Sequence, residues 1–387
     1  MRAGLVWGGI RAPYPNKFGR PLGAVFLVLS LSFAEGDTLL LRNARVVIVS
    51  GATLPQADVL VEDGVIRAVG EKLEAPPGAK RIDLYGRTLT PGFIDCASYL
   101  GLYYEREETL DAVTPELTVL DAFAPKAPSL LEALRAGVTT VHLVPGEHNA
   151  VGGLTAIVKL DRSDGACRVL EPRAGLGVSL TDAALLPLRE PTTRPDLEEL
   201  LRRAFSAAEA GSPLAEARQE RLPVWIQCDE VDQLQTALAL AGELRLHVRL
   251  LGPVEAHRIA ARLREAEAPV VLPTFQRLDG AVGLNGIAEL AQAGVRLAFG
   301  SWTPVAAADD LRTTAALAVW HGLPRDQALR ALTLDAAQIL GIADRTGSVE
   351  PGKQADLVVW NGDPLDLTSR VERVFVEGRV VYGEASP

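Results

Sequence analysis

The sequence of 387 residues contains few cysteines and no strongly basic segment. Its three cysteines, Cys96, Cys167 and Cys228, are too few for a disulfide framework and show no Cys-x-x-Cys metal spacing. The formal net charge of −10, without a basic run or interleaved aromatic residues, argues against nucleic acid or an anionic membrane as a partner. What remains is a globular chain, 48% hydrophobic, which is enough to build one barrel and an accessory domain.

Several common catalytic motifs are absent as well. The pair Gly152-Gly153 is not followed by the Gly-x-x-x-x-Gly-Lys run of a phosphate-binding loop. No Gly-x-Ser-x-Gly nucleophile elbow occurs, and there is no internal repeat or low-complexity tract. These absences exclude the P-loop NTPases and the serine hydrolases that carry such an elbow.

The amino terminus carries the one membrane-related signal. The basic residues Arg11, Lys17 and Arg20 precede the apolar run of residues 21–34, which closes with the small-x-small pattern Ser32-Phe33-Ala34. This order predicts a secretory signal peptide over residues 1–36, cut near Glu35, because the run is too short to span a bilayer comfortably as a helix. We expect a periplasmic or secreted protein. The alternative is a cytoplasmic protein with an apolar amino-terminal strand or helix.

Two regions, residues 37–90 and 343–387, have the pattern of strands and tight turns. Residues 58–69 predict a hairpin turned by Asp63-Gly64, because both positions tolerate positive φ. Residues 371–382 predict a second hairpin, turned by Glu377-Gly378.

Between these regions, residues 91–342 alternate strands with helices. A helix over residues 129–136 begins at a serine and ends at Gly137, and a β-branched strand over residues 138–144 follows it. Such alternation predicts an α/β fold with parallel strands and right-handed crossovers. We expect further strands at residues 223–227, 247–251, 269–272 and 295–300, and further helices at residues 254–267 and 287–293.

Two motifs give the chain a family resemblance. The first is the run Pro91-Gly92-Phe93-Ile94-Asp95, and the second is the tail Gly347-Ser348 followed by Ala355-Asp356-Leu357-Val358. On these residues the chain resembles the amidohydrolase superfamily, in its branch of imidazolonepropionases and related secreted amidohydrolases. The resemblance implies a (β/α)8 TIM-like barrel over residues 91–342. It also implies a composite β-sandwich domain formed by residues 37–90 and 343–387 from both chain ends.

The resemblance also implies an activity, which the metal-ligand positions do not support. Relatives hydrolyse non-peptide C–N bonds with zinc or another divalent metal, held at the barrel mouth by histidines and an aspartate after four of the strands. In this sequence those positions hold small, amide or aromatic side chains, which do not supply such ligands. We therefore expect no metal cofactor. The family positions are occupied by Ala97, Tyr99, Gln227, Gly252 and Trp302.

Other residues could rebuild a site at the mouth. The loop of residues 145–153 follows a strand, and its Glu147 and His148 could bind a ligand, although a solvated pair is the simpler interpretation. Cys96 and Cys228 are expected at strand ends, where buried unreactive thiols are the more common outcome. Our candidate pocket residues are Cys96, Tyr99, Glu147, His148, Gln227, Asp229 and Trp302.

Three hypotheses for function remain open. The preferred one is a degenerate, non-catalytic homologue that acts as a partner of an active relative, as a dimer with itself, or as a binding protein, because function resides in the site rather than in the fold. The second is a hydrolase of C–N bonds with a rearranged or metal-free site, which requires the candidate residues to converge. The third is a structural role in the cell envelope, for which a single exposed apolar patch would be evidence.

Overall fold

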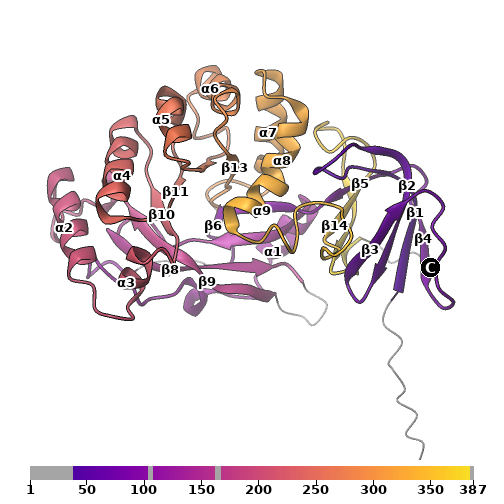
Figure 1. Cartoon of the computed structure of the whole chain (residues 1–387), viewed down its shortest axis with the longest axis horizontal. Helices are drawn as coiled ribbons and strands as arrows, with labels where there is room; N and C mark the ends of the chain where they lie inside the picture. The colour runs from indigo at the N-terminus through magenta and orange to yellow at the C-terminus, as the bar shows by residue number, and fades with distance from the viewer. Residues whose placement is uncertain (1–37, 103–107, 162–166, 384–387) are drawn as a thin grey trace, which may run out of the picture. The chain divides into compact units, whose positions relative to one another are not determined.

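One sheet of the computed structural model combines strands from the two ends of the chain. The structure describes residues 38–102, 108–161 and 167–383. The sheet has the order β16-β15-β14-β5-β1-β2-β3, with β4 paired to β1, so early (indigo) and late (yellow) strands lie side by side in Figure 1. Its strands are β1 (Thr38–Val46), β2 (Leu54–Glu62), β3 (Val65–Gly70), β4 (Lys80–Asp83), β5 (Thr88–Pro91), β14 (Leu357–Trp360), β15 (Val371–Val376) and β16 (Arg379–Tyr382).

Both predicted hairpins are confirmed in this sheet. Strands β2 and β3 are joined by Asp63-Gly64, with φ of 51° and 78°, and strands β15 and β16 by Glu377-Gly378, with φ of 47° and 73°. The two turns touch each other, since a Cβ atom on Gly64 would lie 2.9 Å from the Glu377 carbonyl oxygen. This contact joins Gly64 to Glu377, which lie 313 positions apart in the sequence, so the two hairpins bring the two ends of the chain together.

The second sheet forms the barrel. Its order is β13-β12-β11-β10-β9-β8-β7-β6, and the edge strands meet at the mouth, where the Trp302 amide donates to the Ala97 carbonyl (2.8 Å) and the Tyr99 amide to the Thr303 carbonyl (3.0 Å). The strands are β6 (Phe93–Ser98), β7 (Val138–Leu143), β8 (Val151–Lys159), β9 (Arg168–Ser179), β10 (Val224–Gln227), β11 (Val248–Leu251), β12 (Val270–Leu272) and β13 (Leu297–Phe299).

The barrel departs from the expected (β/α)8 pattern at β8. This strand is antiparallel to both β7 and β9, whereas the other neighbouring pairs are parallel. The short loop of residues 144–150 explains the difference, because a parallel connection needs a long crossover and an antiparallel one does not. The fold is therefore a TIM-like barrel with one reversed strand, and the strictly alternating prediction is wrong in this part.

Helices cover the barrel sheet, and Figure 1 shows α4 to α7 in a row along one side of it. Several begin at the expected signals: the Thr193 and Ser212 hydroxyls accept hydrogen bonds from the first turns of α2 and α3, each of which has a proline at its start. The α-helices are α1 (Ser129–Arg135), α2 (Arg194–Ser206), α3 (Pro213–Arg218), α4 (Val231–Leu244), α5 (Ala260–Glu265), α6 (Gly280–Gln292), α7 (Asp310–Trp320), α8 (Arg325–Leu332) and α9 (Leu334–Leu340).

A buried ion pair joins the barrel to the first sheet. Lys159, at the end of β8, donates from Nζ to Asp356 Oδ2 and to Gln354 Oε1, each at 2.6 Å. Both charged side chains are fully buried, so removing Lys159 would leave the Asp356 carboxylate buried without its cation. This contact gives Lys159 and Asp356 a structural role. The division into domains at residues 90 and 343 stays a prediction.

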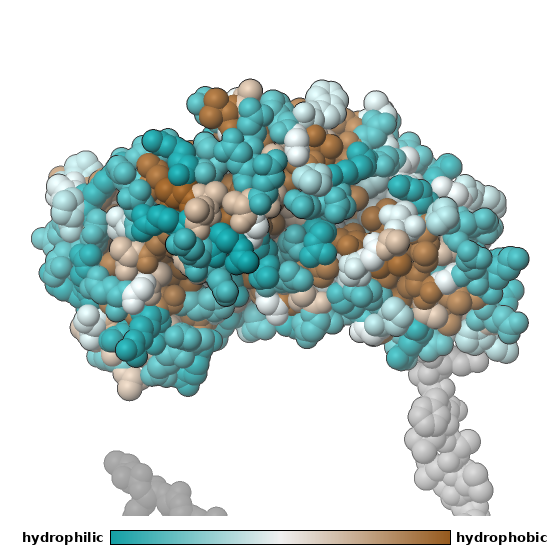
Figure 2. All heavy atoms as spheres, turned by 45° about the horizontal axis from the view of Figure 1, so that its top comes forward, coloured by the Kyte–Doolittle hydropathy of each residue, from teal (hydrophilic) through white to brown (hydrophobic). Residues whose placement is uncertain are grey.

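The exposed apolar residues of the described chain come from several segments. The large exposed hydrophobic side chains come from well-separated segments, for example Tyr85, Leu188 and Trp320. On the face shown in Figure 2, hydrophobic residues form several groups divided by hydrophilic ones. No described helix is long and apolar enough to cross a membrane. The predicted leader, residues 1–36, lies outside the described residues.

Candidate functional site at the barrel mouth

Asp95, the aspartate of the first motif, holds the end of strand β13 against strand β6. Asp95, in β6, is 2% exposed and accepts hydrogen bonds from the Ser301 amide (2.9 Å) and the Ser301 hydroxyl. Burial raises the pKa of Asp95 to about 6, and the bonds from Ser301 oppose this rise. Both carboxylate oxygens are thus engaged in fixing the loop that follows β13.

That loop places Trp302 in the mouth. Its backbone is left-handed (φ 50°) and its side chain is 2% exposed. The indole Nε1 is buried and has no hydrogen-bond partner among the described residues. A buried N–H without an acceptor costs free energy, and so does a left-handed backbone at a residue other than glycine. The packing of the Trp302 ring offsets both costs.

An arginine covers the Trp302 ring. The guanidinium carbon of Arg277 lies 5.5 Å from the centre of the ring, and Arg277 Nη2 donates to Asp229 Oδ1 at 2.8 Å. Burial raises the pKa of Asp229, while the Arg277 charge opposes the rise. Both side chains of the pair are about one-third exposed, so solvent screens their attraction.

These three side chains converge on Gly252, at the end of β11. A Cβ atom placed there would lie 3.4 Å from Asp229 Oδ1. It would lie 3.7 Å from the Trp302 ring and 3.9 Å from Arg277 Nη1. An ion pair and an indole therefore occupy the space around Gly252, a position where the family resemblance implied a metal ligand.

Gln227, at the end of β10, is committed to a neighbouring loop. Its amide Nε2 donates to the Pro145 carbonyl at 3.2 Å, and the side chain is buried. In the same loop, the His148 carbonyl and the Asn149 side chain both accept hydrogen bonds from Arg189. Glu147 and His148 are partly buried and make further contacts within the protein.

The two cysteines do not form a reactive pair. The Cys96 thiol faces helix α9, where Sγ donates to the Ala336 carbonyl at 3.9 Å, and the Cys228 thiol donates to the Ile226 carbonyl at 3.6 Å. Burial raises the pKa of both thiols, so both stay protonated at neutral pH. The structure therefore directs Cys96 away from the mouth.

The donor set at the mouth does not fit a divalent metal ion. Ala97 offers no lone pair, Gln227 is engaged with a backbone carbonyl, and the Asp229 carboxylate is paired with a cation. Across residues 38–102, 108–161 and 167–383, no group of three or more His, Cys, Asp or Glu side chains is arranged to hold a metal.

Sequence reasoning missed Arg277 and Ser301. Arg277 lies five residues beyond β12, in a loop at the mouth end of its strand, and this position was the available signal. Ser301 stands directly after Gly300 in the segment already singled out for Trp302. Neither contact, to Asp229 or to Asp95, can be read from sequence spacing.

Comparison with known proteins places the fold in its family. The crystal structure of an amidohydrolase from Thermotoga maritima is 31% identical, with a TM-score of 0.83, and the match covers 89% of this chain and all of that one. The chain belongs to the amidohydrolase family. The model of that family matches residues 214–382.

Curated amidohydrolase relatives extend the comparison. An imidazolonepropionase of Cereibacter sphaeroides is 27% identical over 89% of this chain and 99% of its own length. The amidohydrolase tasK of Hapsidospora irregularis is 25% identical over 84% of this chain, which spans 40% of that protein. The resemblance stated from the two motifs is confirmed.

Proposed function

We propose that this amidohydrolase-family protein acts by binding and does not hydrolyse C–N bonds. The observation that carries the proposal is the buried indole of Trp302, which lies beneath Arg277 where the family resemblance implies a metal ligand. A guanidinium next to that position repels a divalent cation, and an indole N–H is a donor only. The expected absence of a metal cofactor is part of this proposal.

A hydrolase with a rearranged site is the second candidate. Asp95 favours it, because a buried carboxyl group with a pKa of about 6 is suited to proton transfer. Its oxygens, however, are engaged by Ser301, and the Cys96 thiol faces α9. These contacts support binding over catalysis.

The partner and the compartment are also proposals. We infer an envelope protein that works beside an active relative or as a dimer, on the evidence of the leader pattern in residues 1–36 and the preserved scaffold. Co-purification from the native cell would test this. Recovery of a ligand-complete amidohydrolase or of a dimer supports it, and recovery of a monomer alone contradicts it.

Hydrolysis assays test the proposed function. The protein would be incubated separately with zinc, manganese and iron and offered cyclic amides, including an imidazolone, and proline dipeptides. We expect no turnover above the metal blank. Turnover that survives in Glu199→Gln, an exposed control on α2, but is lost in Asp95→Asn or Asp229→Asn would overturn the proposal.

A further inference from the structure

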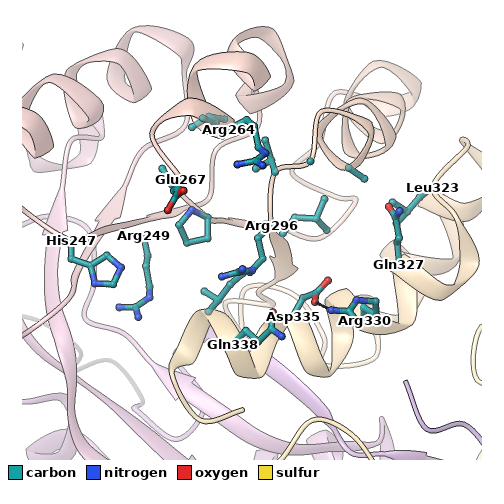
Figure 3. Close-up of a pocket in the computed structure, with 18 residues that line it drawn as sticks. His247, Arg249, Arg264, Glu267, Arg296, Leu323, Gln327, Arg330, Asp335 and Gln338 are labelled. Atoms are coloured by element: carbon teal, nitrogen blue, oxygen red, sulfur yellow. Dashed lines mark hydrogen bonds and ion pairs between the residues drawn. The ribbon is translucent and has the colours of Figure 1, made fainter. Parts of the chain in front are cut away.

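A cavity of about 620 Å³ lies at the opposite end of the barrel, where strands β11, β12 and β13 begin. Its walls include Arg249 of β11, Arg264 of α5, Arg296 before β13 and Arg330 of α8 (Figure 3). The volume falls within the range of small-molecule sites, which is about 300–1,000 Å³. The cavity is therefore large enough for a small organic molecule.

The cavity is positively charged in an acidic protein. Its four arginines face two carboxylates, Glu267 and Asp335, whereas the whole chain has a net charge of −10. Arg330 is paired with Asp335 at 2.6 Å, the ion pair drawn in Figure 3. Within the described part of the chain, the other three arginines have no carboxylate at ion-pair distance, so the excess positive charge stays uncompensated.

Arg249 is held in place without an anionic partner. Its guanidinium carbon lies 5.0 Å from the centre of the Trp225 ring, and its Nη1 atom is buried with no hydrogen-bond partner among the described residues. Burial lowers the pKa of Arg249 to about 10, so it is still charged at neutral pH. A buried donor of this kind is costly until an acceptor reaches it.

The support beneath Arg249 is rigid and neutral. The Trp225 indole donates from Nε1 to the Ala174 carbonyl at 3.2 Å, and its other neighbour, His142, lies with ring centres 4.2 Å apart. His142 donates from Nδ1 to the Cys96 carbonyl at 2.8 Å, and burial lowers its pKa to about 3. No carboxylate in this stack neutralises the guanidinium.

We propose that this cavity binds a small multivalent anion that carries phosphate or carboxylate groups. The planar guanidinium of Arg249 suits the two oxygens of either group, and Arg264 and Arg296 supply further charge from the same cavity. The site lies at the end of the barrel opposite the mouth. The inference is thus independent of whether the mouth hydrolyses C–N bonds.

Calorimetric titration tests the proposal, with pyrophosphate and citrate as separate probes. We expect saturable binding of at least one probe, weakened at least about tenfold in Arg249→Gln and in Arg296→Gln. Arg203→Gln, an exposed control on α2, should bind within about twofold of the unmodified protein. The preferred probe distinguishes a phosphate from a carboxylate ligand.

Three results would overturn the proposal. They are the absence of saturable binding of both probes, an equal loss in Arg203→Gln, and unchanged binding in both cavity variants. Thermal unfolding without ligand would show whether each variant is folded. If Arg249→Gln does not fold, Arg296→Gln provides the test.

Discussion

The two ends of the barrel differ in whether their charged side chains have partners of opposite charge or hydrogen-bond partners. At the mouth, the Asp229 carboxylate is paired with Arg277 and Asp95 is satisfied by Ser301, while Trp302 fills the space between strand ends. At the other end, Arg249 is partly buried, its Nη1 atom has no hydrogen-bond partner among the described residues, and the side chain lines a cavity. The comparison teaches that the carboxylates of the mouth have partners within the protein, whereas the arginines Arg249, Arg264 and Arg296 at the opposite end have no carboxylate partner among the described residues. Substitutions at each end can break or sharpen this difference.

Trp302→Ala should have the largest effect. Removing a buried indole leaves a cavity, and we expect the free energy of unfolding to fall by about 3–5 kcal/mol. Trp302→Gly should lose about 1 kcal/mol less, because glycine accepts the left-handed backbone. Urea denaturation measures both. Trp320→Ala, at an exposed position, is the control and should change stability little; an equal loss there would contradict a packing role for Trp302.

His142, in the stack below Arg249, should make stability rise with pH. Its folded pKa of about 3 is below its unfolded value, so the unfolded chain binds more protons between about pH 3 and pH 6.5. We expect His142→Asn to lose on the order of 3 kcal/mol of the gain that the unmodified protein shows from pH 4 to pH 7. Denaturant midpoints across this range test it. Parallel pH profiles of the two proteins would show that His142 does not titrate this way.

Asp95, at the mouth, should make stability fall as the pH rises. Its folded pKa of about 6 is above its unfolded value, so the folded chain binds more protons and stability is lost as pH rises from about 4 to 6. We expect Asp95→Asn to remove about 2 kcal/mol of this decline. The same denaturation series measures it, and a decline that persists in the variant would refute the assignment.

Arg277→Gln should have the smallest effect. The pair with Asp229 is about one-third exposed, so solvent screening limits the loss of stability to about 1 kcal/mol. The tryptophan emission should also change, because the guanidinium no longer covers the Trp302 ring. A loss of more than about 3 kcal/mol would indicate a buried charge pair instead.

Local signals in the sequence predicted much of the fold. The turns at Asp63-Gly64 and Glu377-Gly378 formed where positive φ was expected, because turn chemistry depends on adjacent residues. The hairpin of β8 and β9 was missed, since β8 is buried along its whole length and a buried strand does not alternate in polarity.

The candidate site was less predictable. Neighbouring strand residues face opposite sides, so Asp95 reaches Ser301 while Cys96 turns to α9. The contacts of Arg277 with Asp229 and of Arg249 with Trp225 join separate strands or loops. Only the assembled barrel brings these residues together.

Metal content per chain tests the central claim about the mouth most directly. The purified protein would be incubated with zinc, manganese or iron without chelator, desalted and analysed by elemental mass spectrometry. The account predicts less than roughly a tenth of an equivalent of each metal, because the described residues of the mouth offer no adequate ligand set. A content near one equivalent that falls in Asp229→Asn would contradict it.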